Sequence, residues 1–172
     1  MSAQLQMLLD VSRLDMGNIQ PDPHLLAIQT IFGNLDATYT PIAKKAGVRL
    51  KFGNQNIQVH TDLILITRLL GNLIDNAIKF APNGTILVCS RIDAKGIRIE
   101  VRDNGPGIPA EHRQKIFDEY DQVHNPARDP NAGLGLGLSI ALRISRLLDI
   151  PLNLHSREGS GTVFSVTLPR CA

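Results

Sequence analysis

Three glycines alternate with three leucines in residues 133–138, "GLGLGL", directly before a segment with helical periodicity. Glycine loses more backbone freedom on folding than any other residue, so this run is costly inside a helix or strand. A glycine-rich turn that leads into a helix presents backbone N–H groups and the positive end of the helix dipole, and both attract anions. The run therefore predicts either a nucleotide-binding loop or a flexible hinge.

Two common phosphate loops do not match this run. The dinucleotide pattern needs a glycine three residues after its second glycine, but positions 138 and 140 are leucine and isoleucine. The Gly-Lys-Ser/Thr of the Walker pattern is also absent from the sequence. A nucleotide loop at this position has to be of another kind.

The composition narrows the class of protein. With 172 residues, 43% hydrophobic and 20% charged, the chain has the balance of a globular domain that can bury a core. Its 18 basic and 16 acidic residues give a net charge of +2, which offers no argument for nucleic-acid binding. Two distant cysteines and no apolar run long enough to cross a membrane indicate a reduced, cytoplasmic location.

Hydrophobic periodicity predicts an α/β two-layer sandwich, in which a mixed, mostly antiparallel sheet packs on helices. Asp62 is a plausible N-cap of the longest helix. The turns "GNQN" and "EGSG" are expected to join neighbouring strands. Helices are expected over residues 1–19, 24–46 (an interruption at Pro41 is left open), 62–80, about 111–117 and 137–148; strands are expected over 48–52, 57–60, 85–92, 97–103, 152–157 and 162–169.

Residues 1–19 form a candidate unit of their own, because the two prolines of "QPDPH" follow them. Apolar residues and one serine recur there at alternating spacings of four and three. That spacing fits a short coiled-coil seam, and it fits equally well an amphipathic helix packed on its own domain.

The helix over 62–80 carries a polar stripe opposite its apolar face. Asn72 and Asn76 are four residues apart, so their amides align, and Lys79 lies one turn further on. A solvated face would explain this stripe. Asparagine carbonyls are also hard oxygen ligands suited to Mg²⁺, and a lysine there could reach a phosphate.

The segment "DNGPGIP", residues 103–109, follows an apolar strand. Its glycines and prolines fit a tight surface turn. A turn explains less well why an acid stands at the strand exit, where the floor of a pocket would lie. The Asp103 carboxylate could accept a hydrogen bond from an amino group such as that of adenine.

Taken in order, these segments resemble the ATP-binding domain of sensor histidine kinases, which belongs to the group shared with DNA gyrase, Hsp90 and MutL. The boxes are Asn-x3-Asn-x2-Lys-Phe, Asp-x-Gly-x-Gly, the "IFDEY" of residues 116–120 and "GLGLGLS". The resemblance covers roughly residues 48–170. Residues 1–19, with "LLDVSRLDMG", resemble the end of the second helix of the family's dimerization domain. The implied division is 1–19 as the tail of that helix and 20–172 as the catalytic domain, with an ATP lid at about 117–136.

The resemblance implies ATP and Mg²⁺ as cofactors and a role for each matching residue. Asn76 would bind Mg²⁺ with Asn72 beside it, Lys79 would contact phosphate, and Asp103 would accept from the adenine amino group, helped by Thr162 through water. Asn72, Asn76 and Lys79 are thus the implied catalytic residues. The remaining implied ATP-binding residues are Phe80, Gly105, Gly107, Ile108, Phe117, Tyr120, Arg128, Gly133, Leu134, Gly135, Leu136, Gly137 and Leu138.

Two departures from the family pattern bear on the reaction. Tyr120 replaces the usual second phenylalanine of the lid motif. Asn72 stands where gyrase-type ATPases carry the glutamate that activates water, and asparagine cannot act as a general base. The sequence therefore favours phosphoryl transfer to a protein over hydrolysis.

The resemblance also implies partners. They are the dimerization and phosphoacceptor domain of the same protein, a receiver domain downstream, and a homodimeric parent that could be membrane-anchored. Alternatives are a serine kinase of the anti-sigma-factor type and a degenerate nucleotide-binding module. We expect a preference for Mg-ATP over Mg-GTP, and no self-phosphorylation. None of the five histidines is followed by the acid of the family's acceptor motif: the next residues are Leu25, Thr61, Arg113, Asn125 and Ser156.

Overall fold

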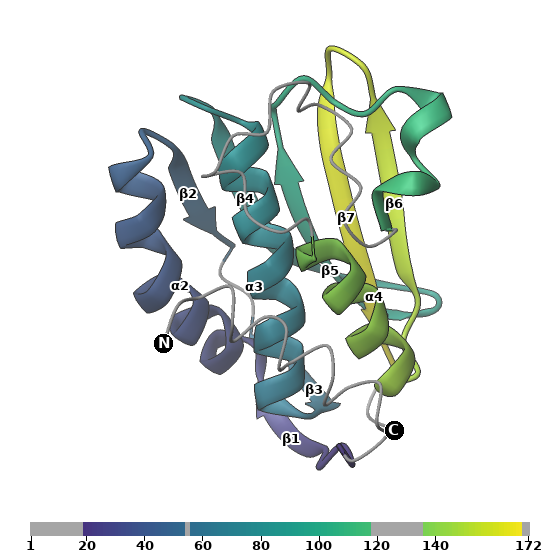
Figure 1. Ribbon diagram of the computed structural model, residues 1–172. Coiled ribbons are helices and arrows are strands. Elements are labelled where there is room, and N and C mark those ends of the chain that lie inside the picture. Colours follow the sequence, from purple (N-terminus) through teal and green to yellow (C-terminus); the bar gives the residue numbers. More distant parts are fainter. Residues whose placement is uncertain (1–18, 54–55, 118–135, 170–172) are drawn as a thin grey trace.

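The computed structural model describes residues 19–53, 56–117 and 136–169 (Figure 1). Its strands are β1 (His24–Ala27), β2 (Arg49–Phe52), β3 (Gln58–Thr61), β4 (Thr85–Asp93), β5 (Gly96–Asp103), β6 (Leu152–Arg157) and β7 (Gly161–Leu168). Its helices are α2 (Ile28–Lys45), α3 (Leu63–Phe80) and α4 (Gly137–Leu147), with the short 3-10 turns η1 (Ala110–His112) and η2 (Lys115–Phe117).

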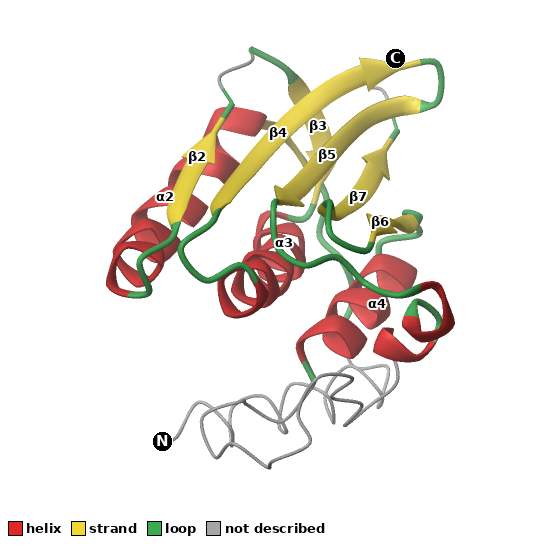
Figure 2. Ribbon diagram, turned by 90° about the horizontal axis from the view of Figure 1, so that it is seen from above, coloured by secondary structure: helices red, strands yellow, loops and turns green. Residues whose placement is uncertain are grey.

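The expected two-layer sandwich is confirmed. Five strands form one sheet in the order β2-β4-β5-β7-β6, and Figure 2 shows α2, α3 and α4 side by side against one face of it. Only the β2–β4 pair is parallel, whereas β4–β5, β5–β7 and β6–β7 are antiparallel. Strands β1 and β3 form a separate two-stranded antiparallel sheet.

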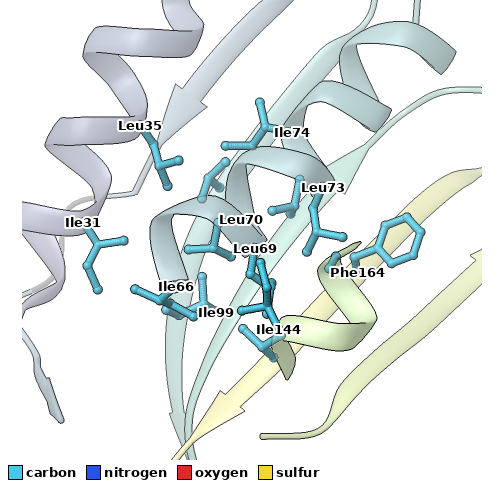
Figure 3. Packing of buried hydrophobic residues seen from close by; sticks show 14 of the residues in the cluster. Ile31, Leu35, Ile66, Leu69, Leu70, Leu73, Ile74, Ile99, Ile144 and Phe164 are labelled. Carbon is cyan, nitrogen blue, oxygen red and sulfur yellow. The ribbon is translucent and has the colours of Figure 1, made fainter. Parts of the chain in front are cut away.

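Helix α3 lies at the centre of the core, as its strong apolar periodicity predicts. The Asp62 carboxylate accepts a hydrogen bond from the Leu65 N–H at 2.9 Å, which confirms Asp62 as the N-cap. In Figure 3 the apolar side chains of α3 pack between those of α2 and α4, with Ile99 of β5 and Phe164 of β7 beside them. Because its other face carries Asn72 and Asn76, this packing fixes where both amides lie.

Two predictions for the N-terminal half are wrong. Residues 24–27 form a strand, and the helix begins only at Ile28 and then runs through Pro41 without interruption. The "GNQN" segment does not close a hairpin, since β2 pairs with β4 and β3 pairs with β1. Pairing with β3 satisfies the backbone groups of residues 24–27 outside a helix, a choice that local propensity cannot anticipate.

Two further boundaries differ. Instead of one helix over 111–117, the chain forms two separate 3-10 turns. The turn between β6 and β7 comprises only residues 158–160, because Gly161 already pairs with Arg157. A Cβ on Gly161 would overlap the carbonyl oxygen of Asp103, so the close packing of β5 on β7 requires glycine at this strand position.

The expected helix over residues 1–19 lies outside the described residues, apart from Ile19, which packs against the core. Among the helices of residues 19–53, 56–117 and 136–169, none is long and apolar enough to cross a membrane.

Replacing two helical glycines by alanine is expected to change stability in opposite directions. A Cβ on Gly33 of α2 meets no atom within 4 Å, so Gly33→Ala should stabilise the protein by about 0.5–1 kcal/mol through helix propensity. A Cβ on Gly71 of α3 would overlap the Tyr39 hydroxyl, and overpacking of this kind costs about 1–3 kcal/mol. Urea denaturation measures both effects. Equal stabilisation by the two variants would show that the Tyr39 ring moves aside freely.

Candidate functional site

The polar stripe of α3 lies at the edge of the core. Asn72 and Asn76 are half-buried, and the Asn72 amide nitrogen donates a hydrogen bond to the backbone oxygen of Arg68 at 3.0 Å. That bond turns the Asn72 carbonyl oxygen away from Arg68. Lys79 is exposed, with its Nζ 5.2 Å from the ring centroid of Phe80, which is itself 37% exposed. The stripe thus offers amide oxygens, a cation and an aromatic ring within three turns of one helix.

Asp103 is the last residue of β5, and its carboxylate is partly buried. One carboxylate oxygen accepts the Gly105 N–H at 2.8 Å. Burial raises the pKa of Asp103 above its ordinary value, while backbone hydrogen bonds from Gly105 and Thr162 act in the opposite direction. A partly buried carboxylate with one oxygen already held by a backbone donor presents its other oxygen as an acceptor of fixed direction.

The two glycines after Asp103 allow close backbone approaches. A Cβ on Gly105 would lie 2.8 Å from the carbonyl oxygen of Phe80, so the end of α3 meets the exit of β5 there. Gly107 has φ of 73°, and a Cβ on it would overlap the carbonyl oxygen of Arg157. Both positions require glycine, which brings the residue 103–109 turn against both α3 and the β6–β7 hairpin.

The C-terminal end of the Gly-Leu run lies against the middle of α3. Leu136 and Leu138 are buried and anchor the start of α4, which Figure 1 shows beside α3. A Cβ on Gly137 would lie 3.5 Å from the Asn72 side-chain oxygen. The N-terminus of α4, where anions bind most readily, therefore adjoins the asparagine stripe.

The remaining predicted site residues lie in the core, in the sheet or outside the described residues. Phe117 packs edge-on against Phe164 in the core, with ring centroids 6.2 Å apart. Thr162 is buried opposite Asp103 in the β5–β7 pair. Ile108 packs against the core and donates its N–H to Ser156 Oγ at 2.8 Å. Tyr120, Arg128, Gly133, Leu134 and Gly135 lie outside the described residues.

Our sequence reasoning missed two residues at this site. Asn104 accepts the Thr85 N–H through its side chain at 2.7 Å and so joins the 103–109 turn to β4. Ser156 bonds to the same turn and to Thr162. An asparagine within a Gly/Pro turn was a signal for the first. For Ser156 the signal was the β6–β7 register, which pairs Ser156 with Thr162. The expected turn over residues 158–161 was one residue too long and hid this pairing.

The donor set fits a magnesium nucleotide. Among the described residues there is no group of three or more His, Cys, Asp or Glu that could hold a metal ion. Asn72 and Asn76 supply amide oxygens instead, which suits Mg²⁺ because this ion is usually held by few protein groups together with substrate phosphates. The close approaches at Gly105 and Gly107 hold the turn after Asp103 against α3 and the β6–β7 hairpin, which fixes the backbone beside the Asp103 carboxylate.

Comparison with known proteins identifies the family. A profile of histidine kinase-, DNA gyrase B- and HSP90-like ATPases matches residues 61–172, which include α3, Asp103 and α4. The chain belongs to this family. The resemblance inferred from the four boxes is therefore confirmed, and this is an ATP-binding catalytic domain of the histidine kinase type.

Relatives of this ATPase domain are long sensor kinases. The autoinducer 2 sensor kinase/phosphatase LuxQ of Vibrio parahaemolyticus is 30% identical over 97% of this chain and 20% of its own length. The sensor histidine kinase RcsC of Escherichia coli is 29% identical over 94% of this chain and 17% of its own. The chain thus spans about a fifth of the length of these relatives.

Solved structures agree with the fold of the ATPase domain. Full-length ShkA in complex with AMPPNP superposes with a TM-score of 0.84 at 24% identity, covering 97% of this chain and 35% of ShkA. The catalytic domain of histidine kinase ThkA in a nucleotide-free form gives a TM-score of 0.73 at 26% identity, covering 87% of this chain and 96% of that domain.

Gly107→Ala is expected to disrupt the site far more than Gly159→Ala. Both glycines have nearly the same left-handed conformation, with φ of 73° and 74°, so both variants share a cost of about 1–2 kcal/mol. Only at Gly107 does a Cβ overlap backbone, whereas Gly159 has nothing within 4 Å. We expect Gly107→Ala to lose about 1–3 kcal/mol more and to weaken ATP binding. Thermal unfolding and nucleotide titration test this, and equal losses in both variants would contradict it.

Proposed function

We propose that this ATPase domain transfers the γ-phosphoryl group of ATP to a histidine that is not among the five in this sequence. The observation that carries the proposal is that two separate segments meet α3 along its length. The N-terminus of α4 lies against Asn72 in the middle of the helix, and the exit of β5 lies against Phe80 at its C-terminal end. Together they supply what a magnesium-bound nucleoside triphosphate requires: hard oxygen ligands for the ion, backbone N–H donors for the phosphates and a carboxylate for the base.

Each group has one task in this proposal. Asn76, with Asn72 beside it, holds the magnesium ion, and Lys79 contacts phosphate. Asp103 and Thr162 orient the adenine, while Phe80 and Ile108 flank the base. When bound, Mg²⁺ neutralises charge on the phosphates. The protein contributes mainly positioning and electrostatic stabilisation.

Asn72 supports transfer over hydrolysis. Its amide cannot take a proton from water, and its nitrogen is already engaged by the backbone oxygen of Arg68. We therefore expect slow ATP hydrolysis in the absence of a protein acceptor.

The proposal extends to the parent protein. Residues 1–19 would be the tail of its dimerization helix, and residues 20–172 the catalytic domain with a lid at about 117–136. The acceptor histidine would lie on the dimerization domain of a homodimer, and a receiver domain would take the phosphoryl group onward. We place the domain in the cytoplasm, where ATP is available.

Incubation with γ-labelled ATP tests the transfer. The domain alone should acquire no label, and a supplied dimerization segment with a His-acid pair should acquire label that acid removes. Phosphohistidine is acid-labile, whereas phosphoserine is acid-stable, so acid-stable label would indicate a serine kinase instead. The matched control is the same segment with its histidine replaced by alanine.

Two outcomes would contradict this function. Acid-labile label on the isolated domain would show that one of its own histidines accepts the phosphoryl group. Failure of the domain to bind any nucleotide would make it a degenerate member of the family.

A further inference from the structure

Three polar side chains form a row across the sheet where the proposed adenine site lies. Asp103 of β5 pairs directly with Thr162 of β7, and Thr162 pairs directly with Ser156 of β6. Directly opposite residues on neighbouring strands project to the same face of the sheet. Across the sheet the three side chains therefore lie side by side in the order Asp103, Thr162, Ser156. Thr162 and Ser156 are buried, at 5% and 4% exposure.

The Ser156 hydroxyl has three partners, which use its whole hydrogen-bonding capacity. It accepts the Ile108 N–H at 2.8 Å and donates to the carbonyl oxygen of Gly161 at 3.0 Å. Its third contact is the Thr162 hydroxyl at 3.0 Å. A serine hydroxyl has one proton and accepts at two lone pairs.

This inventory fixes the direction of the third bond. A carbonyl oxygen only accepts, so the single proton of Ser156 is used by Gly161. Thr162 must then be the donor to Ser156, and its own single proton is also used. What Thr162 has left is lone pairs alone.

We propose that Ser156 is a specificity-determining positioning residue, which holds Thr162 as a hydrogen-bond acceptor and so selects adenine over guanine nucleotides. This inference rests on the proposed function, because it assumes that the base lies against Asp103 and Thr162, with the Thr162 hydroxyl facing the base directly rather than through the water that the family resemblance implies. Both residues then present acceptors only. The 6-amino group of adenine satisfies that surface with donors, whereas the 6-carbonyl of guanine meets acceptor against acceptor.

Ser156→Ala should therefore relax base selectivity. Without the serine oxygen the Thr162 hydroxyl rotates, and its proton becomes available to a purine 6-carbonyl. The Ile108 N–H loses its partner as well, which loosens the 103–109 turn and weakens every nucleotide alike. A purely structural role of Ser156 predicts only this common loss, but our proposal predicts that nucleotides with a 6-carbonyl bind more tightly in absolute terms.

The experiment is calorimetric titration of the folded domain with Mg-ATP, Mg-GTP and Mg-ITP, the last sharing the 6-carbonyl without the 2-amino group. We expect the wild type to prefer ATP by about a hundredfold, and Ser156→Ala to lower that ratio by about tenfold, one neutral hydrogen bond. Ser156→Thr keeps the hydroxyl and should have the same ratio of ATP to GTP affinity as the wild type. Ser165→Ala removes a second buried serine from β7, away from this row, and should leave the ratio unchanged.

Two further variants keep the proposal falsifiable. If Ser156→Ala does not fold, Ser156→Cys replaces the oxygen by a weak acceptor and should shift the ratio in the same direction. Thr162→Val has no proton to offer, so it should not gain affinity for GTP or ITP.

The outcomes separate this inference from the proposed function. A wild type that binds ATP selectively, with an unchanged ratio in folded Ser156→Ala and Ser156→Cys, overturns the role of Ser156 alone. A wild type that binds none of the three nucleotides overturns the proposed function, and this inference with it. Tighter GTP and ITP binding in the serine variants, reversed in Ser156→Thr, is the result that supports it.

Discussion

Asp103→Asn is expected to weaken Mg-ATP binding by roughly a hundredfold, the loss of one charged hydrogen bond plus a donor–donor conflict. The reason is the contact with Gly105, whose N–H donates to one side-chain oxygen at 2.8 Å. In the asparagine variant this donor holds the amide oxygen, so the amide NH₂ takes the place of the other oxygen. The amide NH₂ is a donor, so it conflicts with the adenine amino group but can donate to the guanine carbonyl oxygen. Calorimetric titration should therefore show GTP binding gained as ATP binding is lost.

The same variant should be more stable than the wild type at neutral pH. Burial raises the folded-state pKa of Asp103, so the folded protein holds this proton more tightly than the unfolded chain does. Its contribution to stability is present below the unfolded pKa of about 3.9 and is lost as the pH rises through the folded pKa. At pH 7 the buried charge is a net cost, and Asp103→Asn removes it.

Asp93→Asn is the matched control, because the pKa of Asp93 is shifted in the opposite direction. The Arg98 side chain hydrogen-bonds to Asp93 and lowers its pKa, with further donation from the Lys95 N–H. Its stabilising contribution is present above the unfolded pKa and is lost as the pH falls through the folded pKa. Thermal unfolding should show destabilisation for this variant and unchanged ATP binding. A fall in stability for both variants would contradict our inference that the buried charge of Asp103 destabilises the folded protein at pH 7.

Asn76→Ala is expected to abolish the magnesium dependence of nucleotide binding. Loss of a metal ligand should exceed the roughly 10- to 100-fold loss typical of residues that only support ligands. Phosphoryl transfer should fall by at least about a hundredfold, because positioning and charge neutralisation of the phosphates fail together. ATP titrations with Mg²⁺ and with EDTA should differ for the wild type and coincide for the variant.

Asn34→Ala serves as the control for Asn76→Ala. Asn34 is an exposed asparagine on α2, and its described contact uses only its backbone oxygen, which accepts from Thr38. This variant should keep the full magnesium response. If Asn76→Ala keeps it too, the ion is held elsewhere and the asparagine stripe has only a solvent-facing role.

Much of the central architecture follows from local signals. The apolar period and the capping side chain of Asp62 predict α3, since a helix buries one stripe and needs its first N–H groups satisfied. Alternating apolar residues likewise predict β4 and β5, which match within one or two residues. The four boxes identify the candidate nucleotide site without any coordinates, because each box is a local pattern on one element.

The pairing of the N-terminal strands could not be read in this way. Residues 24–27 are apolar enough for a helix, and only the edge of β3 makes them a strand. Strands β2 and β3 are close in sequence but belong to different sheets, because β2 pairs in parallel with β4 after the long crossover through α3. Strand pairing is a non-local choice, and propensity carries no information about which partner is available.

By itself the sequence determined the identity of most elements, the core face of α3 and the residue types of the nucleotide site. Only the tertiary structure decided which atoms meet. It brings Gly137 to Asn72 and Gly105 to Phe80, contacts between segments that are far apart along the chain. It also sets the β6–β7 register, in which a one-residue shift decides whether Thr162 faces Arg157 or Ser156. The physical reason is that side chains alternate faces along a strand, so a register set by packing determines every neighbour, whereas periodicity determines only which face is buried.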